Sequence, residues 1–376
     1  DISLFRTALQ TVLDQSDALR TIIQVEDGVS RQIVLPQLEL PLQIKDFSAE
    51  PNPKTAARQW LQQIITVPFN HQKRFVQFAL ATINPEEHVW LMNQHHIIAD
   101  ASSSFHIFQV VSRTYEQLTN PAAEIELPQI TPFHIYRDYL HDYRQSAQYK
   151  RAGRYWEQKL VEDVVPLSFF GQRKSKKSTH ARRLNIELDA ERTARLTKLA
   201  EQENVRDLTK ELTMFNILAG LFFALVYHLT GNQRIGFLSP VHNRPTQAFR
   251  QSIGLLMELC PFVVTFSPGE TPASLIQKLK QLTRGVMRFS QHGSSLVLNN
   301  KVHDLMFNYH RRPSLVFNGR SVEQEHLFTG HSNDSLALHI HEFEQSGTLK
   351  FKFDFHLDIF TEEQQETAVA SFYALL

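Results

Sequence analysis

The chain has 376 residues, of which 42% are apolar and 21% charged, a composition typical of a folded globular protein and not of a disordered one. Lysine plus arginine and aspartate plus glutamate both number 39, so the charge gives no reason to expect binding to nucleic acid or to a membrane surface. The single cysteine, Cys260, excludes an internal disulfide and a thiolate-rich metal site, and it fits a cytoplasmic location.

The first third of the chain alternates between helical and strand-like hydrophobic patterns. In chain order these patterns predict a helix over 4–13, a hairpin of strands over 18–25 and 30–35, a helix over 55–65, strands over 75–83 and 88–93, and a helix over 103–118. The N-terminus opens inside a helical pattern and shows no secretory signal, which suggests that preceding residues are missing. The last predicted strand leads into a histidine pair, so residues 95–102 should form a strand-to-helix loop, where catalytic side chains are common.

The rest of the chain repeats this mixture. After a long helical region over 131–160 and a basic stretch over 173–177 we predict a strand over 183–188, a helix over 191–202, a buried helix over 212–229, strands over 234–238 and 262–266, a helix over 273–289, strands over 304–309, 336–343 and 349–355, and a closing helix from 362. At this length, the pattern predicts two α/β lobes, an N-terminal lobe over 1–160 and a C-terminal lobe over 161–376.

Two histidines are followed four residues later by an aspartate: His96 by Asp100, and His134 by Asp138. The second pair lies within a helical pattern, where such residues are ordinary surface neighbours. The first pair follows a strand and a second histidine, His95, and imidazole is the side chain best suited to accept and return a proton near neutral pH. A buried histidine at a strand end, with its hydrogen bonds satisfied, is the alternative interpretation. A metal site is disfavoured because adjacent histidines point apart on an extended chain and no third ligand is evident.

The sequence lacks the motifs of several other kinds of catalytic or binding site. A Gly-rich phosphate loop, a dinucleotide fingerprint and a serine hydrolase elbow are all absent. Cys260 lies in an apolar run typical of inert buried thiols. A reaction through a covalent serine intermediate of the hydrolase type is therefore not predicted.

The HHxxxD segment over 95–100 resembles the catalytic motif of the condensation domains of nonribosomal peptide synthetases, within the chloramphenicol-acetyltransferase-like superfamily. Further segments resemble this family in the family's order: LRT at 19–21, PFN at 68–70, YWEQKL at 155–160, YHLTG at 227–231, SPVHNRP at 239–245, IGLLMELCP at 253–261 and FNY at 307–309. The likeness covers nearly the whole chain, except that the family's first motif is missing.

This resemblance implies two acetyltransferase-like lobes that form a V-shaped pseudo-dimer with a central tunnel. The domain itself would bind no cofactor. Its donor and acceptor would arrive on the phosphopantetheine of acyl or peptidyl carrier proteins, within a larger megasynthase or from separate partners. The resemblance implies catalytic roles around His95, His96 and Asp100, with His96 acting on the acceptor nucleophile, and structural or tunnel-lining positions at Ala101, Ser102, Arg244, Glu258 and Asn308. Asp100 would act through structure, paired with Arg244 across the lobes.

The sequence departs from the family at two positions. Ala101 stands where the family has glycine after the aspartate, and Glu258 stands where it has asparagine. Both departures point to an unusual acceptor, to an ester product or to weakened activity. Two alternatives stay open: a stand-alone acyltransferase that uses a free acceptor or an acyl-CoA, and a catalytically retired domain that only recruits carriers.

Overall fold

The computed structural model describes residues 1–159, 165–292, 304–343 and 347–376 and divides into two compact units. Unit 1 consists of Asp1–Gln145, His242–Met257 and Leu315–Thr329, and unit 2 of Ser146–Val241, Glu258–Ser314 and Gly330–Leu376. Both units combine helices and strands, which confirms the predicted α/β class. Each unit is therefore assembled from three separate stretches of sequence.

Unit 1 is built around a three-stranded sheet of order β3-β4-β5 with a separate hairpin, β1-β2. Its elements are α1 (Ile2–Gln15), the one-turn helix η1 (Ala18–Arg20), β1 (Thr21–Glu26), β2 (Val29–Val34), β3 (Leu42–Asp46), α2 (Pro53–Thr66), β4 (Val76–Asn84), β5 (Glu87–Gln94), α3 (Ala101–Thr119), α4 (Phe133–Gln145), α8 (Gln247–Arg250), β10 (Leu315–Phe317) and β11 (Arg320–Val322).

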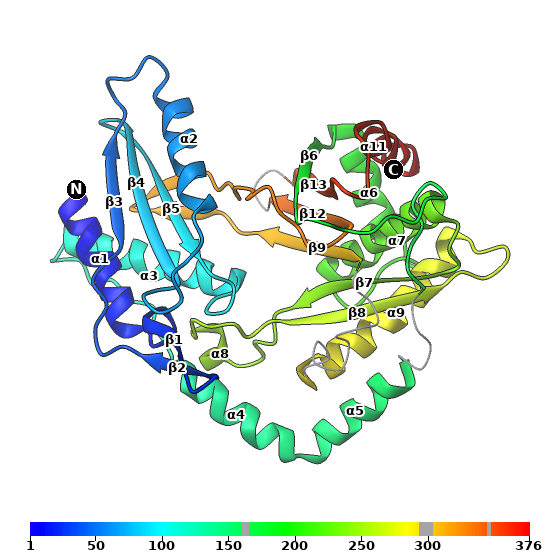
Figure 1. The fold of residues 1–376 in the computed structure, drawn as a ribbon, viewed down its shortest axis with the longest axis horizontal. Coiled ribbons are helices and arrows are strands. Elements are labelled where there is room, and N and C mark those ends of the chain that lie inside the picture. The colour runs from blue at the N-terminus through cyan, green and yellow to red at the C-terminus, as the bar shows by residue number, and fades with distance from the viewer. Residues whose placement is uncertain (160–164, 293–303, 344–346) are drawn as a thin grey trace. The chain divides into compact units, whose positions relative to one another are not determined.

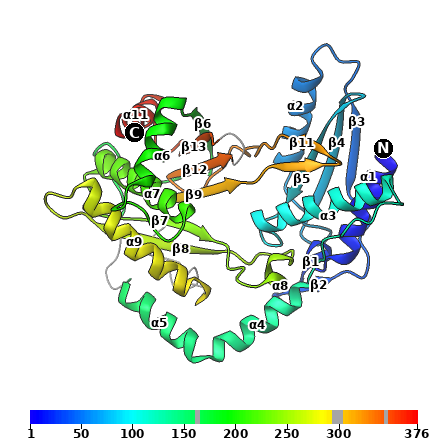
Figure 2. The same cartoon turned by 180° about the vertical axis from the view of Figure 1, so that it is seen from behind.

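The central strand β4 is apolar on both faces, and this decides how the helices of unit 1 pack. Phe78 and Leu80 belong to a core formed with α1 and α3, whereas Ala79 and Ala81 pack against α2. Because successive side chains of a strand point to opposite faces, α2 and α3 cover the two faces of the sheet (Figure 1, Figure 2). The strand that leads to the histidine pair, β5, is thereby fixed at the edge of this layer.

Unit 2 is built around a six-stranded sheet of order β6-β13-β12-β9-β7-β8. Its elements are α5 (Ala147–Lys159), β6 (Ala181–Glu187), α6 (Ala190–Glu201), α7 (Lys210–Thr230), β7 (Arg234–Val241), β8 (Glu258–Thr265), α9 (Pro272–Phe289), the one-turn helix η2 (Ser290–His292), β9 (Leu305–Arg312), β12 (Leu336–Phe343), β13 (Leu349–His356) and α11 (Glu362–Leu375).

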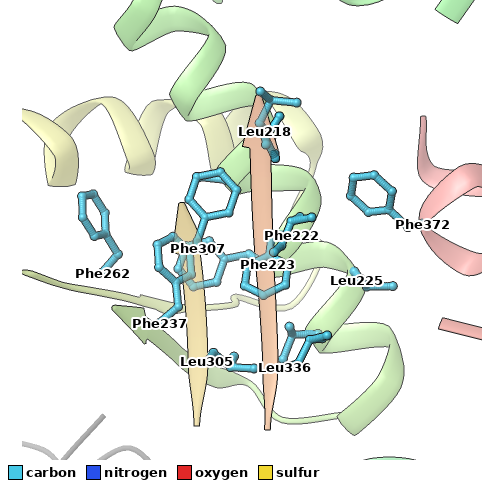
Figure 3. Packing of buried hydrophobic residues seen from close by; sticks show 14 of the residues in the cluster. Leu218, Phe222, Phe223, Leu225, Phe237, Phe262, Leu305, Phe307, Leu336 and Phe372 are labelled. Atoms are coloured by element: carbon cyan, nitrogen blue, oxygen red, sulfur yellow. The ribbon is translucent and has the colours of Figure 1, made fainter. Parts of the chain in front are cut away.

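One face of this sheet carries a phenylalanine-rich core that packs against α7 (Figure 3). Phe237 of β7 and Phe307 of β9 point toward Phe222 and Phe223 of α7, and all four side chains are fully buried. The alternation that places these residues on the helix-covered face places Asn308 and its strand neighbours on the opposite, polar face.

The helix α7 is long and apolar enough, by length and composition alone, to cross a membrane. About two thirds of its apolar window (67%) is nevertheless buried inside the protein, against the sheet and against α9 and α11. This packing confirms the prediction of a buried core helix for this segment.

Most predicted elements are found with shifted ends, but Ala18–Arg20, predicted as the start of a strand, forms the one-turn helix η1, and the short helix α8 was not predicted. The predicted helical region over 131–160 is two helices, α4 and α5, because the helix breaks at Ser146, whose hydroxyl accepts a hydrogen bond from the N–H of Tyr149. The short strands β3, β10 and β11 were not predicted. The predicted lobe boundary at 160/161 lies outside the described residues. The prediction gave each lobe one continuous stretch of sequence, whereas each compact unit of the structure contains three stretches.

The aromatic core of unit 2 generates a stability prediction. The ring of Phe237 contacts four other rings, those of Phe222, Phe223, Phe262 and Phe307. Phe237→Ala removes these contacts and leaves a cavity, so we expect a loss of about 3–5 kcal/mol in the free energy of unfolding, measured by denaturant titration. Met287→Ala, at a half-exposed position of α9, is the control and should change stability by about 0.5 kcal/mol or less. Equal effects of the two variants would contradict this account of the core.

Candidate functional site

The histidine pair lies on the turn between β5 and α3 in unit 1. The backbone N–H of His95 donates to the carbonyl of Phe75 at 2.9 Å and so extends the pairing of β4 with β5 by one residue. The N–H of Ile98 then donates to the carbonyl of His95 at 3.1 Å and closes a turn, and α3 begins at Ala101. The predicted strand-to-helix loop over 95–102 is thus a short turn held between a paired strand and a helix N-terminus.

His95 is fixed in place by its surroundings. Its Nδ1 accepts a hydrogen bond from the N–H of Ile97 at 3.1 Å, and its ring packs against those of Phe69, His71 and Phe75 at centroid distances of 6.0, 5.8 and 5.2 Å. Burial lowers the pKa of His95, and the neighbouring imidazoles of His71 and His96 lower it further. His95 is therefore a neutral side chain that shapes the turn, with its proton on Nε2.

His96 has the opposite environment. It is exposed, and its imidazole makes no hydrogen bond within the described part of the chain. The next side chain, Ile97, is also 39% exposed, whereas Ile98, Ala99 and Asp100 are buried. The turn therefore presents the His96 ring on the surface of unit 1, where a bound molecule can hydrogen-bond to it.

Asp100 is the N-cap of α3, and its side chain is completely buried. Its Oδ1 accepts from the N–H of Ser103 at 2.9 Å, as N-cap residues do, and its Oδ2 accepts from the N–H groups of Leu256 and Met257 at 3.1 and 3.2 Å. The carboxylate thus joins the start of α3 to the segment His242–Met257, so its observed contacts are structural.

Arg244 completes this arrangement. Its Nη2 lies 2.8 Å from Oδ1 of Asp100, with 4% of the arginine side chain exposed, and its Nη1 donates to the carbonyls of Phe249 and Ser252. The preceding residue, Asn243, has φ +49°, a left-handed conformation that asparagine tolerates better than most residues. Both partners of the predicted ion pair belong to unit 1. By sequence Arg244 falls in the predicted C-terminal lobe, but its segment packs with the N-terminal residues.

Sequence reasoning missed two residues that support this ion pair. The Ser103 hydroxyl lies 3.0 Å from Asp100 Oδ1 and 2.7 Å from the carbonyl oxygen of Gly254. It also accepts a hydrogen bond from Arg244 Nη2 at 3.0 Å. A Cβ on Gly254 would lie 2.1 Å from a ring carbon of Phe133, so only glycine fits there. A capping interaction between an aspartate and the serine three residues later is readable in the sequence, but the contact of Gly254 with Phe133 is not.

The remaining predicted site residues are spread over both units. Ser102 Oγ lies 3.3 Å from Nδ1 of His242, and Ala101 is the exposed first residue of α3. Glu258 is the half-buried first residue of β8, and Asn308 lies on the polar face of the sheet in unit 2. Ala101 and Ser102 therefore belong to unit 1, and Glu258 and Asn308 belong to unit 2.

The second histidine–aspartate pair behaves as a surface pair. His134 and Asp138 are exposed residues of α4, and Asp138 bonds with Arg137, while Nδ1 of His134 lies 4.0 Å from Asp17. As for metals, the residues that the structure describes contain no group of three His, Cys, Asp or Glu side chains that could hold an ion.

The ion pair predicts strong coupling between its two partners. Removing either charge leaves the other buried without compensation, so Asp100→Ala and Arg244→Ala should each lose about 3–5 kcal/mol of stability. The double variant should lose less than the sum, as a thermal-unfolding cycle would measure. Arg58→Ala, which breaks the exposed pair of Arg58 with Glu325 in the same unit, is the control and should cost about 0–1 kcal/mol. Strict additivity of the two buried substitutions would contradict the coupling.

The chain is similar to curated synthases over nearly its whole length. It is 24% identical over 376 residues to the isonitrile lipopeptide synthase of Streptomyces coeruleorubidus, an alignment that covers 96% of this chain and 25% of that protein. It is 24% identical over 400 residues to the enniatin synthase of Fusarium equiseti, an alignment that covers 100% of this chain and 12% of that protein. The chain thus spans a quarter or less of these two relatives.

Solved structures share the fold. The starter condensation domain of rhizomide synthetase in complex with C8-CoA matches with a TM-score of 0.86 at 21% identity, over 100% of this chain and 86% of that one. The first condensation domain of the CDA synthetase matches with a TM-score of 0.82 at 17% identity, over 100% of this chain and 87% of that one. The family model described as Condensation domain matches residues 1–376. The chain therefore belongs to the condensation domain family, the acyltransferase-type domains of nonribosomal peptide synthetases.

Proposed function

We propose that this domain joins an acyl or peptidyl thioester on one carrier protein to an amine or hydroxyl acceptor, with His96 acting on the acceptor nucleophile. The observation that carries the proposal is the contrast between the two adjacent histidines. His95 is held neutral inside the turn, whereas His96 is exposed, with its ring nitrogens available to a bound molecule. A general base must be able to reach the proton that it removes, and of the two histidines His96 is the exposed one.

The reaction follows from this placement. The acceptor nitrogen or oxygen attacks the thioester carbonyl, a C–N or C–O bond forms, and the C–S bond breaks. The proton of the acceptor passes to the His96 imidazole and then to the departing thiolate of the donor. Binding both tethered reactants in one site replaces a bimolecular encounter by an oriented one, which lowers the barrier by up to roughly 7–11 kcal/mol.

The partners proposed for this domain are acyl or peptidyl carrier proteins, which supply donor and acceptor on phosphopantetheine. The relatives that contain a similar segment are synthases several times longer than this chain, and this supports a place within a megasynthase. A cytoplasmic location is part of the same proposal. The domain would bind no cofactor of its own, because its substrates bring the reactive thioester with them.

A second candidate function keeps the chemistry and changes the donor. The similar starter condensation domain of rhizomide synthetase was solved in complex with C8-CoA, and this complex favours acyl-CoA as an alternative donor. Product formation from a loaded carrier and from the matching acyl-CoA, measured side by side by intact mass, separates the two donors. A domain that forms product with neither would be a retired, carrier-recruiting one.

The first functional prediction concerns His96. His96→Ala should lower the rate of product formation by about 10²–10⁴-fold, as loss of a general base does, and leave the thermal unfolding temperature unchanged because the side chain is exposed. His134→Ala, another exposed histidine of unit 1, is the matched control and should be almost silent. Near wild-type product formation by His96→Ala would disprove the assignment.

The second functional prediction concerns the acceptor. Ala101 adds a methyl group at the first position of α3, five residues after His96, and Glu258 places a half-buried carboxylate at the start of β8. We therefore expect a preference for a small amine or a hydroxyl acceptor over bulky aminoacyl carriers.

One loaded donor and an acceptor panel test this preference by intact mass. Ala101→Gly and Glu258→Asn should shift the ranking toward bulky acceptors. The alternative is that Glu258 only pairs with a cation and that Ala101 only packs. It would be supported if bulky acceptors are already the best and both variants leave the ranking unchanged.

A further inference from the structure

The sheet of unit 2 has a polar face, opposite the phenylalanine core. The strand register places every second residue of β6, β13, β12 and β9 on this face. Arg183, Asp354, His339 and Asn308 lie there, one from each of these four neighbouring strands. Their side chains are in contact in this order, and we call the set the relay.

The first two members of the relay form a buried ion pair. Nε and Nη2 of Arg183 lie 2.6 and 2.7 Å from the two carboxylate oxygens of Asp354, and only 8% and 5% of the two side chains are exposed. Burial alone would raise the pKa of Asp354, but the hydrogen bonds from Arg183 and His339 outweigh it and hold that pKa below its usual value. Asp354 is therefore ionised at neutral pH and can only accept hydrogen bonds.

An ionised Asp354 fixes the tautomer of the next member, His339. Nε2 of His339 lies 3.3 Å from Oδ2 of Asp354, so Nε2 must carry the proton. With the proton on Nε2, Nδ1 of His339 has a free lone pair. Nδ2 of Asn308 lies 3.4 Å from Nδ1 and donates a hydrogen bond to it. The tautomer of His339 thus determines which end of the Asn308 amide faces the histidine.

The other end of that amide has no partner. Oδ1 of Asn308 is buried and makes no hydrogen bond within the described residues. A buried carbonyl oxygen without a donor is unfavourable, and native proteins rarely keep one without a reason. A bound molecule that supplies an N–H or O–H group to Oδ1 would remove this cost.

We propose that His339 is a positioning residue of the condensation reaction, and that the relay turns the Asn308 carboxamide so that its Oδ1 accepts a hydrogen bond from an N–H group of a tethered substrate. This inference rests on the proposed function. The substrate class that fits is one with an amide or amine N–H close to the thioester, as in an aminoacyl or peptidyl group or the amides of a phosphopantetheine arm. His339 itself does not touch the substrate; it acts through Asn308.

A pair of substitutions separates the two contacts of His339. An asparagine amide occupies nearly the position of the imidazole Nδ1, and a glutamine amide nearly that of Nε2. His339→Asn can therefore keep the acceptor for Asn308 and lose the contact with Asp354, whereas His339→Gln keeps the Asp354 contact and loses Asn308.

We expect His339→Gln to raise the KM for the tethered substrate about tenfold and to change kcat less. In His339→Asn, the KM should stay near that of the wild type. His331→Gln, at an exposed histidine of the same unit whose Nδ1 bonds with Thr179, is the control and should be silent. Equal effects of the two His339 variants would overturn the proposal, since a purely structural role would not distinguish them.

The second measurement does not depend on activity. Nitrogen NMR of ¹⁵N-histidine-labelled protein should show a proton on Nε2 of His339, facing Asp354, and Nδ1 acting as the acceptor for Asn308. Mildly alkaline buffer keeps the nearby Asp334 ionised, because burial raises its pKa to about 6.

A His339 proton on Nδ1 in the wild type would also overturn the proposal. If the wild type forms no product with any loaded carrier or acyl-CoA, the proposed function fails. The NMR result then decides the relay by itself.

Discussion

The buried pair of Asp100 and Arg244 holds the rest of the candidate site together. Two charges removed from water are stable only when hydrogen bonds replace their hydration, and here every carboxylate oxygen has several donors. Those donors come from the start of α3 and from the segment His242–Met257, which contributes no strand to the sheet of unit 1 in the described structure. The position of His96, four residues before Asp100, is therefore set by a contact in which His96 takes no part.

Both units use the same physical device. In each unit, an arginine forms an ion pair with a buried carboxylate, and the carboxylate accepts hydrogen bonds that fix the orientation of the polar groups around it. Asp100 orders backbone N–H groups and fixes a turn, whereas Asp354 orders an imidazole and, through it, a carboxamide. A carboxylate held ionised can only accept, so each neighbour is forced into the donor role and one geometry is selected.

Local features of the structure were predictable, and long-range ones were not. Helical and strand periodicity predicted most elements, including the hairpin of β1 and β2, which turns at Asp27-Gly28 with φ +52° and +77°. The strand β3 was missed because it is short and its residues are mostly exposed: Leu42-Gln43-Ile44-Lys45 alternates between apolar and polar residues over only four positions. The HHxxxD segment identified His96 and Asp100, and the family resemblance identified Arg244. The sequence could not indicate Ser103 as a shared partner, the contact of Gly254 with Phe133, or the interleaving of the two units, because each depends on residues more than a hundred positions apart.

That interleaving has a consequence for synthesis on the ribosome. Domains generally fold from the N-terminus as they emerge, at about 5–20 residues per second. Arg244, however, lies 144 residues after Asp100, so the carboxylate waits on the order of ten seconds for its partner. The hydrophobic core of unit 1 also needs Ile253 and Phe317, which are synthesised after α7 and after the strands β6 and β7 of unit 2. The stretch Asp1–Gln145 must therefore persist as an incomplete core until the later segments of unit 1, His242–Met257 and Leu315–Thr329, have been synthesised.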